Sequence, residues 1–299
     1  MKRRLPDPVE AVEVTPDLER RAERAERWRG FRLAVPAYVY LIVLFAVPLV
    51  LVGVYSFASR SRTGQPLLHD WNLDSVKRLA DSAFLQIAWR SILLALLTTI
   101  ICLVVAYPFS YYIATRSERT RNVLLVFVMI PFWSNFLVRT YAWKVLLGAD
   151  GIFTRIGEAL GLWGQLLFTM PAVLIGLIYG FLPFMVLPLY ASIERLDWSL
   201  VEAARDLYAT GPKAFRRVTL PLSRPGIIAG SILVFIPSLG AYVTPDILGG
   251  AKTTLLGNYI VNQFLAARNW PLGSSISMAI MIVMLLATVL YFRSGGRTL

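Results

Sequence analysis

The sequence has few of the side chains on which catalytic and metal-binding chemistry usually depends. Its 299 residues include one cysteine, Cys102, and one histidine, His69. The cysteine lies inside an apolar run, so we expect no disulfide framework. The histidine has no cysteine or carboxylate cluster around it at ligand spacing, so we expect no metal site. We also find no Ser/His/Asp constellation, which leaves little for nucleophilic catalysis.

A phosphate-binding loop of the form G-x-x-x-x-G-K-S/T is also missing, so the chain cannot hydrolyse ATP by that route. Charged residues make up only 16% of the chain, whereas hydrophobic residues make up 57%. A soluble domain of this length is much more polar. Several uninterrupted apolar runs of about 20 residues predict membrane-spanning helices. We therefore expect an all-α integral membrane protein that is not an enzyme.

Six apolar runs predict six transmembrane helices, at about 33–57, 87–114, 123–147, 168–193, 226–243 and 274–292. They divide the chain into a charged tail (1–30), a transmembrane domain (31–293) and a short C-terminal tail (294–299). The first run is too long for the core of a signal peptide and lacks a cleavage site of small residues. It is therefore expected to stay in the protein as an anchor.

The basic residues give an orientation. The formal net charge is +12, but these residues flank the apolar runs and do not form the aromatic-interleaved groove of a nucleic-acid-binding protein. With six spans both termini lie on one side, and twenty of the 30 Lys and Arg residues fall on that side. The positive-inside rule then places both termini in the cytoplasm.

The polar connection at 194–225 lies on the same side as the termini and predicts two short helices with a sharp turn between them. Ser199 and Glu202 have the spacing of a capping box at the start of the first helix. Gly211 can take the left-handed conformation that ends a helix, and Pro212 can open the next one. An exposed pair of helices between two spans is suited to contact with a partner.

This connection resembles the EAA loop of bacterial ABC importer permeases, through Glu202–Ala204 and later Leu220-Pro221. The resemblance implies that the first helix docks on a cytoplasmic ATPase and transmits its power stroke. One departure is Tyr208, where the family usually has glycine. The alternative is that Glu202 only caps a helix. The residues to which the resemblance gives a coupling role are Glu202, Ala203, Ala204, Arg205, Asp206, Leu207 and Gly211.

Prolines and glycines interrupt the third to fifth spans, and such breaks belong against other helices or a water-filled path. The clearest break is Ile236–Asp246, which includes Tyr242 and Asp246 near the outer end of the fifth span. An acidic side chain near a membrane path is a candidate functional residue. Asp246 is equally consistent with a helix cap or a turn.

A second outer cluster, Pro131–Trp143, mixes aromatic and polar residues, including Trp133, Asn135 and Tyr141. Aromatic residues at a membrane edge usually anchor the helix at the interface or contact a partner. Their faces also attract organic cations, so the same residues are candidates for a substrate path. Arg139, in the same cluster, opposes a cation path unless it pairs with a carboxylate.

Three segments resemble the spermidine/putrescine permease group: Pro131–Trp143, Ser238–Lys252 and Asn269–Gly273. The resemblance covers about 31–293. It implies a type I ABC importer (MetI-like) permease fold in the bacterial inner membrane, with polyamines as substrates. It also implies a second homologous permease, an ATPase dimer that binds ATP and Mg, and an extracytoplasmic binding protein, with no cofactor in this chain.

Permeases for other small solutes, such as opines, amino acid derivatives or ferric ion, share parts of these motifs. A secondary transporter is less consistent with the sequence, because the chain has no obvious internal repeat and no acidic residues in the cores of its spans. An intramembrane enzyme would need a polar catalytic cluster, which the sequence lacks. The sequence does not specify which polyamine is carried.

Overall fold

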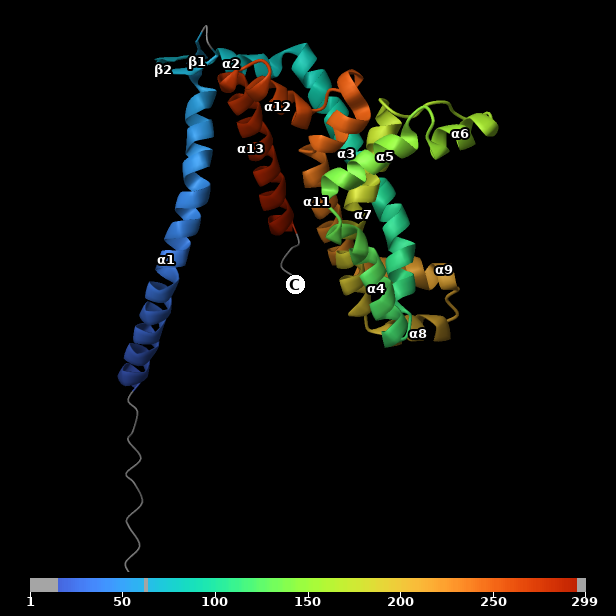
Figure 1. The fold of residues 1–299 in the computed structure, drawn as a ribbon. Coiled ribbons are helices and arrows are strands. Elements are labelled where there is room, and N and C mark those ends of the chain that lie inside the picture. Colours follow the sequence, from blue (N-terminus) through green and yellow to red (C-terminus); the bar gives the residue numbers. More distant parts are fainter. Residues whose placement is uncertain (1–15, 62–63, 295–299) are drawn as a thin grey trace, which may run out of the picture. The chain divides into compact units, whose positions relative to one another are not determined.

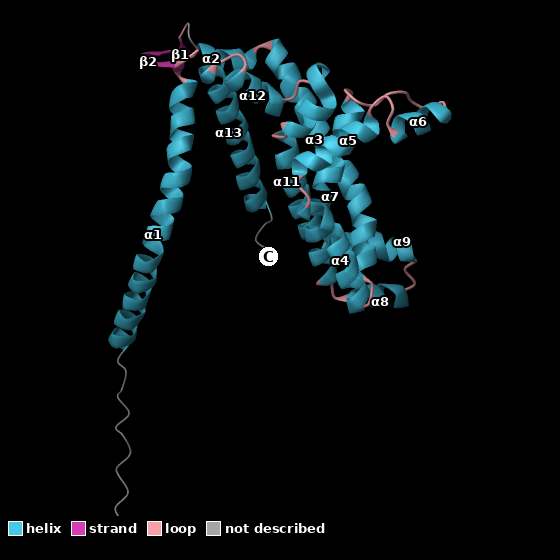
Figure 2. Ribbon diagram, viewed as in Figure 1, coloured by secondary structure: helices cyan, strands magenta, loops and turns pink. Residues whose placement is uncertain are grey.

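A computed structural model describes residues 16–61 and 64–294. Most of these residues are helical, and one short hairpin supplies the strands (Figure 2). The chain divides into two compact units, Met1–Val54 and Tyr55–Leu299. Residues 1–15 of the predicted N-terminal tail and residues 295–299 of the predicted C-terminal tail lie outside the described residues.

The first unit consists of helix α1, which runs from Pro16 to Ser56 and ends just inside the second unit. Its N-terminal part carries the charged segment, and its C-terminal part, Ala34–Ser56, is long and apolar enough to cross a membrane. The charged segment and the first span are therefore one continuous helix. Pro36 and Pro48 lie within it without ending it.

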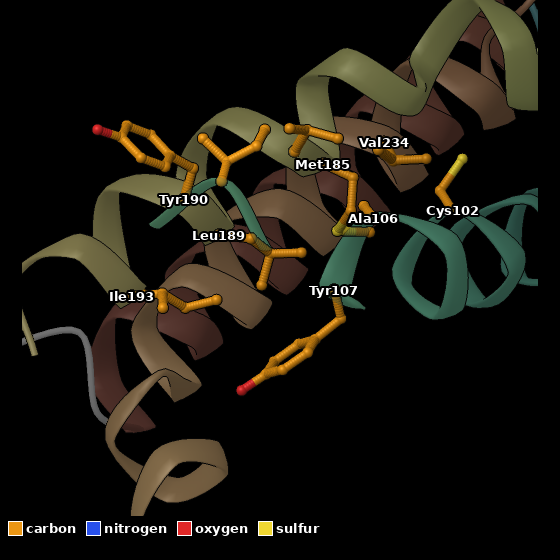
Figure 3. Close-up of a cluster of buried hydrophobic side chains, with 10 residues drawn as sticks. Cys102, Ala106, Tyr107, Met185, Leu189, Tyr190, Ile193 and Val234 are labelled. Atoms are coloured by element: carbon orange, nitrogen blue, oxygen red, sulfur yellow. The ribbon is translucent and has the colours of Figure 1, made fainter. Parts of the chain in front are cut away.

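Three helices form the centre of the second unit: α3 (Ser82–Ala114), α7 (Met170–Glu194) and α11 (Arg224–Leu239). Their facing side chains form a buried apolar cluster, of which Figure 3 shows the part around Tyr107, Leu189 and Val234. A hydrophobic side chain that moves from lipid into a contact between helices gains little free energy. Tight packing and close approach of the backbones therefore hold such helices together.

Two glycines bring α11 close to α7. A Cβ atom at Gly226 would lie 2.4 Å from Ser192 Cβ and 2.7 Å from the carbonyl oxygen of Pro188. A Cβ atom at Gly230, one turn later, would lie 2.7 Å from Met185 Sδ. This four-residue spacing of small residues is typical of closely packed membrane helices.

Three helices within the described residues are long and apolar enough to span a membrane, and two further pairs do so if each bent pair is one span. The last helix, α13 (Trp270–Ser294), has a shorter apolar stretch, Trp270–Leu286. The third span was predicted at about 123–147 with an interruption at Pro131, and it is bent, although the break follows Trp133 and Pro131 lies inside a helix. Two helices, α4 (Glu118–Trp133) and α5 (Phe136–Leu147), cover it and bend by 90° between them.

The end of the second unit opposite α8 and α9 carries the hairpin, α12 and α13 (Figure 1). Strand β1 (Ala58–Arg60) pairs antiparallel with β2 (Pro66–Trp71), with an irregularity after Ala58. The Arg60 guanidinium donates a hydrogen bond to the Ala267 carbonyl, and Ser275 Oγ donates one to the Ser56 carbonyl. Short elements here are α2 (Asp74–Lys77), η1 (Arg78–Ala80) and α12 (Leu256–Leu265).

The remaining elements connect the long helices. The connection between α5 and α7 holds the amphipathic helix α6 (Ile152–Ala159). The connection between α7 and α11 holds α8 (Trp198–Asp206), α9 (Gly211–Ala214), the π-helix η2 (Phe215–Thr219) and α10 (Leu220–Leu222). A second π-helix, η3 (Pro245–Gly249), and the 3₁₀ turn η4 (Gly250–Lys252) follow α11.

Candidate coupling loop and substrate path

The connection between α7 and α11, called here the coupling loop (195–223), lies at one end of the three central helices (Figure 1). Its first helix, α8, presents Glu202, Ala203, Arg205 and Asp206 to solvent, while Val201 is buried and Ala204 is half-buried. Trp198, Val201 and Ala204 follow a three-residue spacing, so they lie on one side of the helix. Of the predicted coupling residues in α8, all except Ala204 therefore lie on the exposed side, and Leu207 and Gly211 follow in the turn and in α9.

The start of α8 differs from the sequence prediction. Asp197 is the N-cap, and its carboxylate accepts hydrogen bonds from Ser199 Oγ at 2.7 Å and from the Ser199 amide at 3.0 Å. These hydrogen bonds lower the pKa of the Asp197 carboxyl, because they stabilise its charged form. The predicted capping box of Ser199 and Glu202 is thus wrong, since the preceding carboxylate already satisfies the amide that opens the helix.

The turn after α8 is also made by an unexpected residue. Tyr208 has φ +58°, the left-handed conformation that usually requires glycine. Gly211 does not have a positive φ and instead begins α9, with Pro212 in the first turn as predicted. The prediction that Gly211 closes the first helix is therefore wrong. The left-handed turn occurs at the position where the EAA loop usually has glycine.

The turn exposes two large side chains. Leu207 is 82% exposed and Tyr208 is 95% exposed. Single exposed apolar residues are common on protein surfaces, but this adjacent pair lies at the tip of a loop beside an exposed row of charged residues. Apolar side chains within a charged surface are typical of a protein contact.

The predicted path residues around the third span lie at the bend between α4 and α5. Asn135 is the N-cap of α5, and its side-chain oxygen accepts a hydrogen bond of 2.8 Å from the Leu137 amide. The bend thus has a local cause, because this cap begins a new helix two residues after α4 ends. Trp133 is 84% exposed and Tyr141 is also exposed, so neither ring belongs to the core.

The second group of path candidates lies just beyond α11. This helix ends at Leu239, four residues before the predicted end of the fifth span. Tyr242 is half-exposed, and its carbonyl accepts a hydrogen bond of 3.0 Å from the amide of Asp246. Asp246 lies in the first turn of η3 and is exposed. Its side chain is therefore accessible, which both a path and a turn role would require.

Helices α5 and α7 pack against η3, so the two segments that carry the path candidates meet. A cavity of about 10 Å³ lies between them, which is room for about one water molecule. Arg139 lines it, with its guanidinium carbon 5.8 Å from the ring centres of Phe132 and Phe136. Among the described residues no hydrogen-bond partner reaches the buried Arg139 Nε. The other residues that line the cavity are Phe136, Thr140, Trp143, Gly176, Tyr179, Gly180 and Leu248.

The structure also reveals residues that the sequence prediction missed. Tyr107 and Tyr111 of α3 pack against the coupling loop, and Arg121 of α4 forms an ion pair of 2.8 Å with Glu194 at the end of α7. The spacing of Tyr107 and Tyr111 did not predict a contact with the coupling loop, because aromatic residues four apart in an apolar run usually indicate core packing. Within residues 16–61 and 64–294, no three His, Cys, Asp or Glu side chains gather as a metal site would require.

Comparison with known proteins agrees with this architecture. Residues 106–295 match the family described as binding-protein-dependent transport system inner membrane component. The chain belongs to this family. The match covers α4 to α13, including the coupling loop and the bend, and it confirms the permease family predicted from the EAA motif. The permease is thus a multi-pass inner membrane protein, and its family is one of transport components, not enzymes.

Curated relatives extend the match over most of the permease. It is 40% identical over 261 residues to the spermidine/putrescine transport system permease protein PotB of Haemophilus influenzae, covering 86% of this chain and 91% of the relative. It is 42% identical over 228 residues to PotB of Escherichia coli, covering 75% of this chain and 83% of the relative. It is 32% identical over 278 residues to the Escherichia coli inner membrane ABC transporter permease protein YdcU, covering 87% and 88%.

Solved structures share the fold of the permease. A crystal structure of a bacterial ABC transporter that imports the acidic polysaccharide alginate superposes with a TM-score of 0.66 over 92% of this chain and 99% of that chain, at 16% identity. A bacterial alginate ABC transporter in complex with its periplasmic protein superposes with a TM-score of 0.67 over 90% of this chain and 94% of that chain, at 14% identity. This likeness confirms the predicted ABC importer fold and carries no information about substrate.

Proposed function

We propose that this permease is one of two related membrane subunits of an ATP-driven importer for polyamines of the putrescine and spermidine type. The observation that carries the substrate class is the identity of 40% to 42% with permeases named for spermidine and putrescine transport, over most of both chains. The proposed partners are a second homologous permease, an ABC ATPase dimer that binds ATP and Mg, and an extracytoplasmic solute-binding protein. Both termini face the cytoplasm in this arrangement.

The exposed side of the coupling loop is the proposed ATPase contact. Glu202, Ala203, Arg205 and Asp206 supply a mixed-charge surface, and Leu207 supplies an exposed apolar side chain at the adjoining turn. Ala204 lies on the half-buried side of α8, and Gly211 begins the second helix of the loop, α9. Closure of the ATPase dimer on ATP moves α8, and the membrane helices then rock toward an outward-open state. The binding protein releases its substrate into the path that opens.

The proposed path runs past Tyr242 and Asp246, with Trp133, Asn135 and Tyr141 at the neighbouring bend. A carboxylate and aromatic faces both attract a polyamine cation. The hydrogen bond that Asn135 accepts from Leu137 gives it a structural role as well, which limits its side-chain oxygen as a substrate ligand. Asp246, whose side chain is exposed, is therefore the stronger candidate.

Energised uptake of labelled putrescine and spermidine tests the substrate class, in cells with and without this gene. Uptake that depends on the gene and resists excess unlabelled arginine or ferric citrate is the expected result. If uptake does not depend on the gene, the polyamine assignment is wrong, while the permease family stands on the sequence match.

Two matched pairs of variants test the sites. Glu202→Ala should reduce ATP-driven uptake, whereas Glu158→Ala, which removes an exposed carboxylate from α6, should not. Asp246→Asn should raise the KM for spermidine by about tenfold, equivalent to about 1.4 kcal/mol of lost attraction. Asp150→Asn, an exposed residue in the connection before α6, is its control. Equal kinetics within a pair would remove the role proposed for Glu202 or Asp246.

A further inference from the structure

A buried hydroxyl pair links α3 to the far end of the coupling loop. Tyr107 Oη lies 2.7 Å from Ser223 Oγ, and Ser223 Oγ donates a hydrogen bond of 3.1 Å to the Leu220 carbonyl. Because Ser223 gives its only hydroxyl proton to Leu220, Tyr107 is the donor to Ser223. Both side chains are buried, and a buried hydroxyl is costly unless it is hydrogen-bonded. A phenylalanine would fill the same space without that requirement.

Aromatic contacts extend the link to both helices of the loop. The Tyr107 ring meets Phe215 edge to face, with centres 5.4 Å apart. The Tyr111 ring meets Phe215 at 6.3 Å and Trp198 at 5.8 Å. Trp198 begins α8 and Phe215 begins η2, so the contacts lie on both sides of the turn at Tyr208. Tyr107 and Tyr111 are four residues apart and therefore project from the same face of α3.

These contacts matter because α3 does not adjoin the coupling loop in the sequence. Helices α7 and α11 flank the loop in the chain and must follow its movement, whereas α3 receives that movement through side chains, directly from the loop and indirectly from its packing on α7 and α11. The contact falls at the first residue of the π-helix η2, and such irregular turns occur frequently at functional sites. Ser110, on the same part of α3, donates a hydrogen bond of 3.1 Å to the Val186 carbonyl of α7. Helix α3 is thus tied to the loop and to α7 at the same level.

We propose that Tyr107 and Tyr111 form an aromatic clamp, with Phe215, Trp198 and Ser223, that delivers the movement of the coupling loop to α3. The proposal rests on the proposed function, since it needs an ATPase that displaces the loop. Tyr107 and Tyr111 are positioning residues, because they act through the loop and contact neither ATP nor substrate. Without the clamp, the ATPase still docks and turns over, but α3 moves less, because only its packing on α7 and α11 still carries the movement.

The complete importer complex, reconstituted in lipid vesicles, allows hydrolysis and transport to be measured together. Tyr107→Leu and Phe215→Leu should lower the amount of spermidine taken up per ATP hydrolysed by about fivefold or more, the usual range for coupling between sites. Hydrolysis itself should be retained. The control is Tyr112→Leu, which removes an exposed ring from the next position of α3. An unchanged ratio in both clamp variants would overturn the proposal.

Milder variants decide the question if the leucine variants do not assemble. Tyr107→Phe and Ser223→Ala each break the hydroxyl pair while keeping the packing, and each should lower the ratio of uptake to hydrolysis. The expected order is that Tyr107→Phe retains more coupling than Tyr107→Leu, because the ring contact with Phe215 remains. If assembled Tyr107→Phe and Ser223→Ala complexes both keep the full ratio, the clamp does not transmit movement.

A measurement without substrate separates this proposal from the proposed function. Spin labels at Ser82, the end of α3 away from the loop, and at exposed Leu265 of α12 report movement of α3. In the otherwise native chain, with Cys102→Ser to avoid a third label, ATP should change the distance between them. Tyr107→Leu should reduce that change while hydrolysis continues. If ATP changes nothing without the clamp substitution, the coupling scheme itself is wrong; if the change is as large in Tyr107→Leu, only the clamp is wrong.

Discussion

Substitution of Gly226 by alanine is the sharpest test of the packing that holds the coupling loop between its two flanking helices. Gly226 lies in the first turn of α11, directly after the loop, and it faces the last turns of α7, directly before the loop. An added Cβ atom would lie 2.4 Å from Ser192 Cβ and 2.7 Å from the carbonyl oxygen of Pro188. The second of these atoms belongs to the backbone and cannot rotate away.

The size of the effect follows from these distances. Carbon atoms pack at about 3.5 to 4.0 Å, so the two helices must separate by about 1 Å to accommodate the methyl group. Overpacking of this kind costs about 1 to 3 kcal/mol, and the backbone contact places Gly226→Ala near the upper value. A loss of about 3 kcal/mol lowers the ratio of folded to unfolded protein by about a hundredfold.

Unfolding of the detergent-solubilised permease by increasing sodium dodecyl sulfate, followed by circular dichroism, measures this loss. Gly164→Ala is the matched control, because nothing lies within 4 Å of the added Cβ atom and its φ is not in the left-handed region. That control should change the free energy of unfolding by at most about 1 kcal/mol, in the stabilising direction. If Gly226→Ala behaves like Gly164→Ala, close contact between α7 and α11 at this level does not occur.

Three further predictions concern the coupling loop and its surroundings. Asp197→Ala should speed hydrogen exchange in the first turn of α8, because the cap on Ser199 is lost. Since the pKa of Asp197 is lowered in the folded protein, the cap contributes fully at neutral pH, and its contribution disappears as the pH falls through the lowered pKa. Tyr208→Val should destabilise the turn by about 1 kcal/mol, because a β-branched residue tolerates φ +58° poorly. Tyr208→Gly should not destabilise it, and equal hydrogen exchange in the two variants would contradict the left-handed turn. A double-mutant cycle with Arg121→Gln and Glu194→Gln should give a coupling energy of about 0.5 to 1 kcal/mol for this partly exposed pair, and a value near zero would show that the ion pair contributes nothing.

The sequence was a good guide to features that depend on composition and on local motifs. Long apolar runs indicate membrane helices, because hydrocarbon requires every backbone polar group to be satisfied within the segment. The position of the coupling loop followed from a polar stretch between two such runs. Its family could be predicted from Glu202–Ala204 and Leu220-Pro221, and the match of residues 106–295 confirms it.

The failures have local physical causes. The third span was expected to break at Pro131, but the bend lies at Trp133 and Asn135, because the Asn135 cap starts a new helix there. At the start of α8, the sequence prediction considered only Ser199 as the cap, but the carboxylate of Asp197 is the oxygen that reaches the open amide. Likewise, the left-handed residue could be Gly211 or Tyr208, and residue propensity favours the wrong one.

Contacts between distant segments were not predictable from a single sequence. The hydroxyl pair of Tyr107 and Ser223 joins residues 116 positions apart. Each residue has an ordinary explanation in its own segment, Tyr107 as an aromatic residue in an apolar helix and Ser223 as the residue before a helix. Only the fold brings them together and gives the tyrosine hydroxyl a specific partner.

The length of α3 has a mechanical consequence. Its 33 residues make a helix of about 50 Å, longer than the hydrocarbon core of a membrane. The clamp holds it near one end, at Tyr107 and Tyr111, and Pro108 between them removes one backbone hydrogen bond and makes a natural hinge. A tilt of about 5° at the hinge would move the other end, about 39 Å away, by about 3 Å. Helix α3 would then act as a lever that turns a small displacement of the coupling loop into an opening on the opposite side of the membrane.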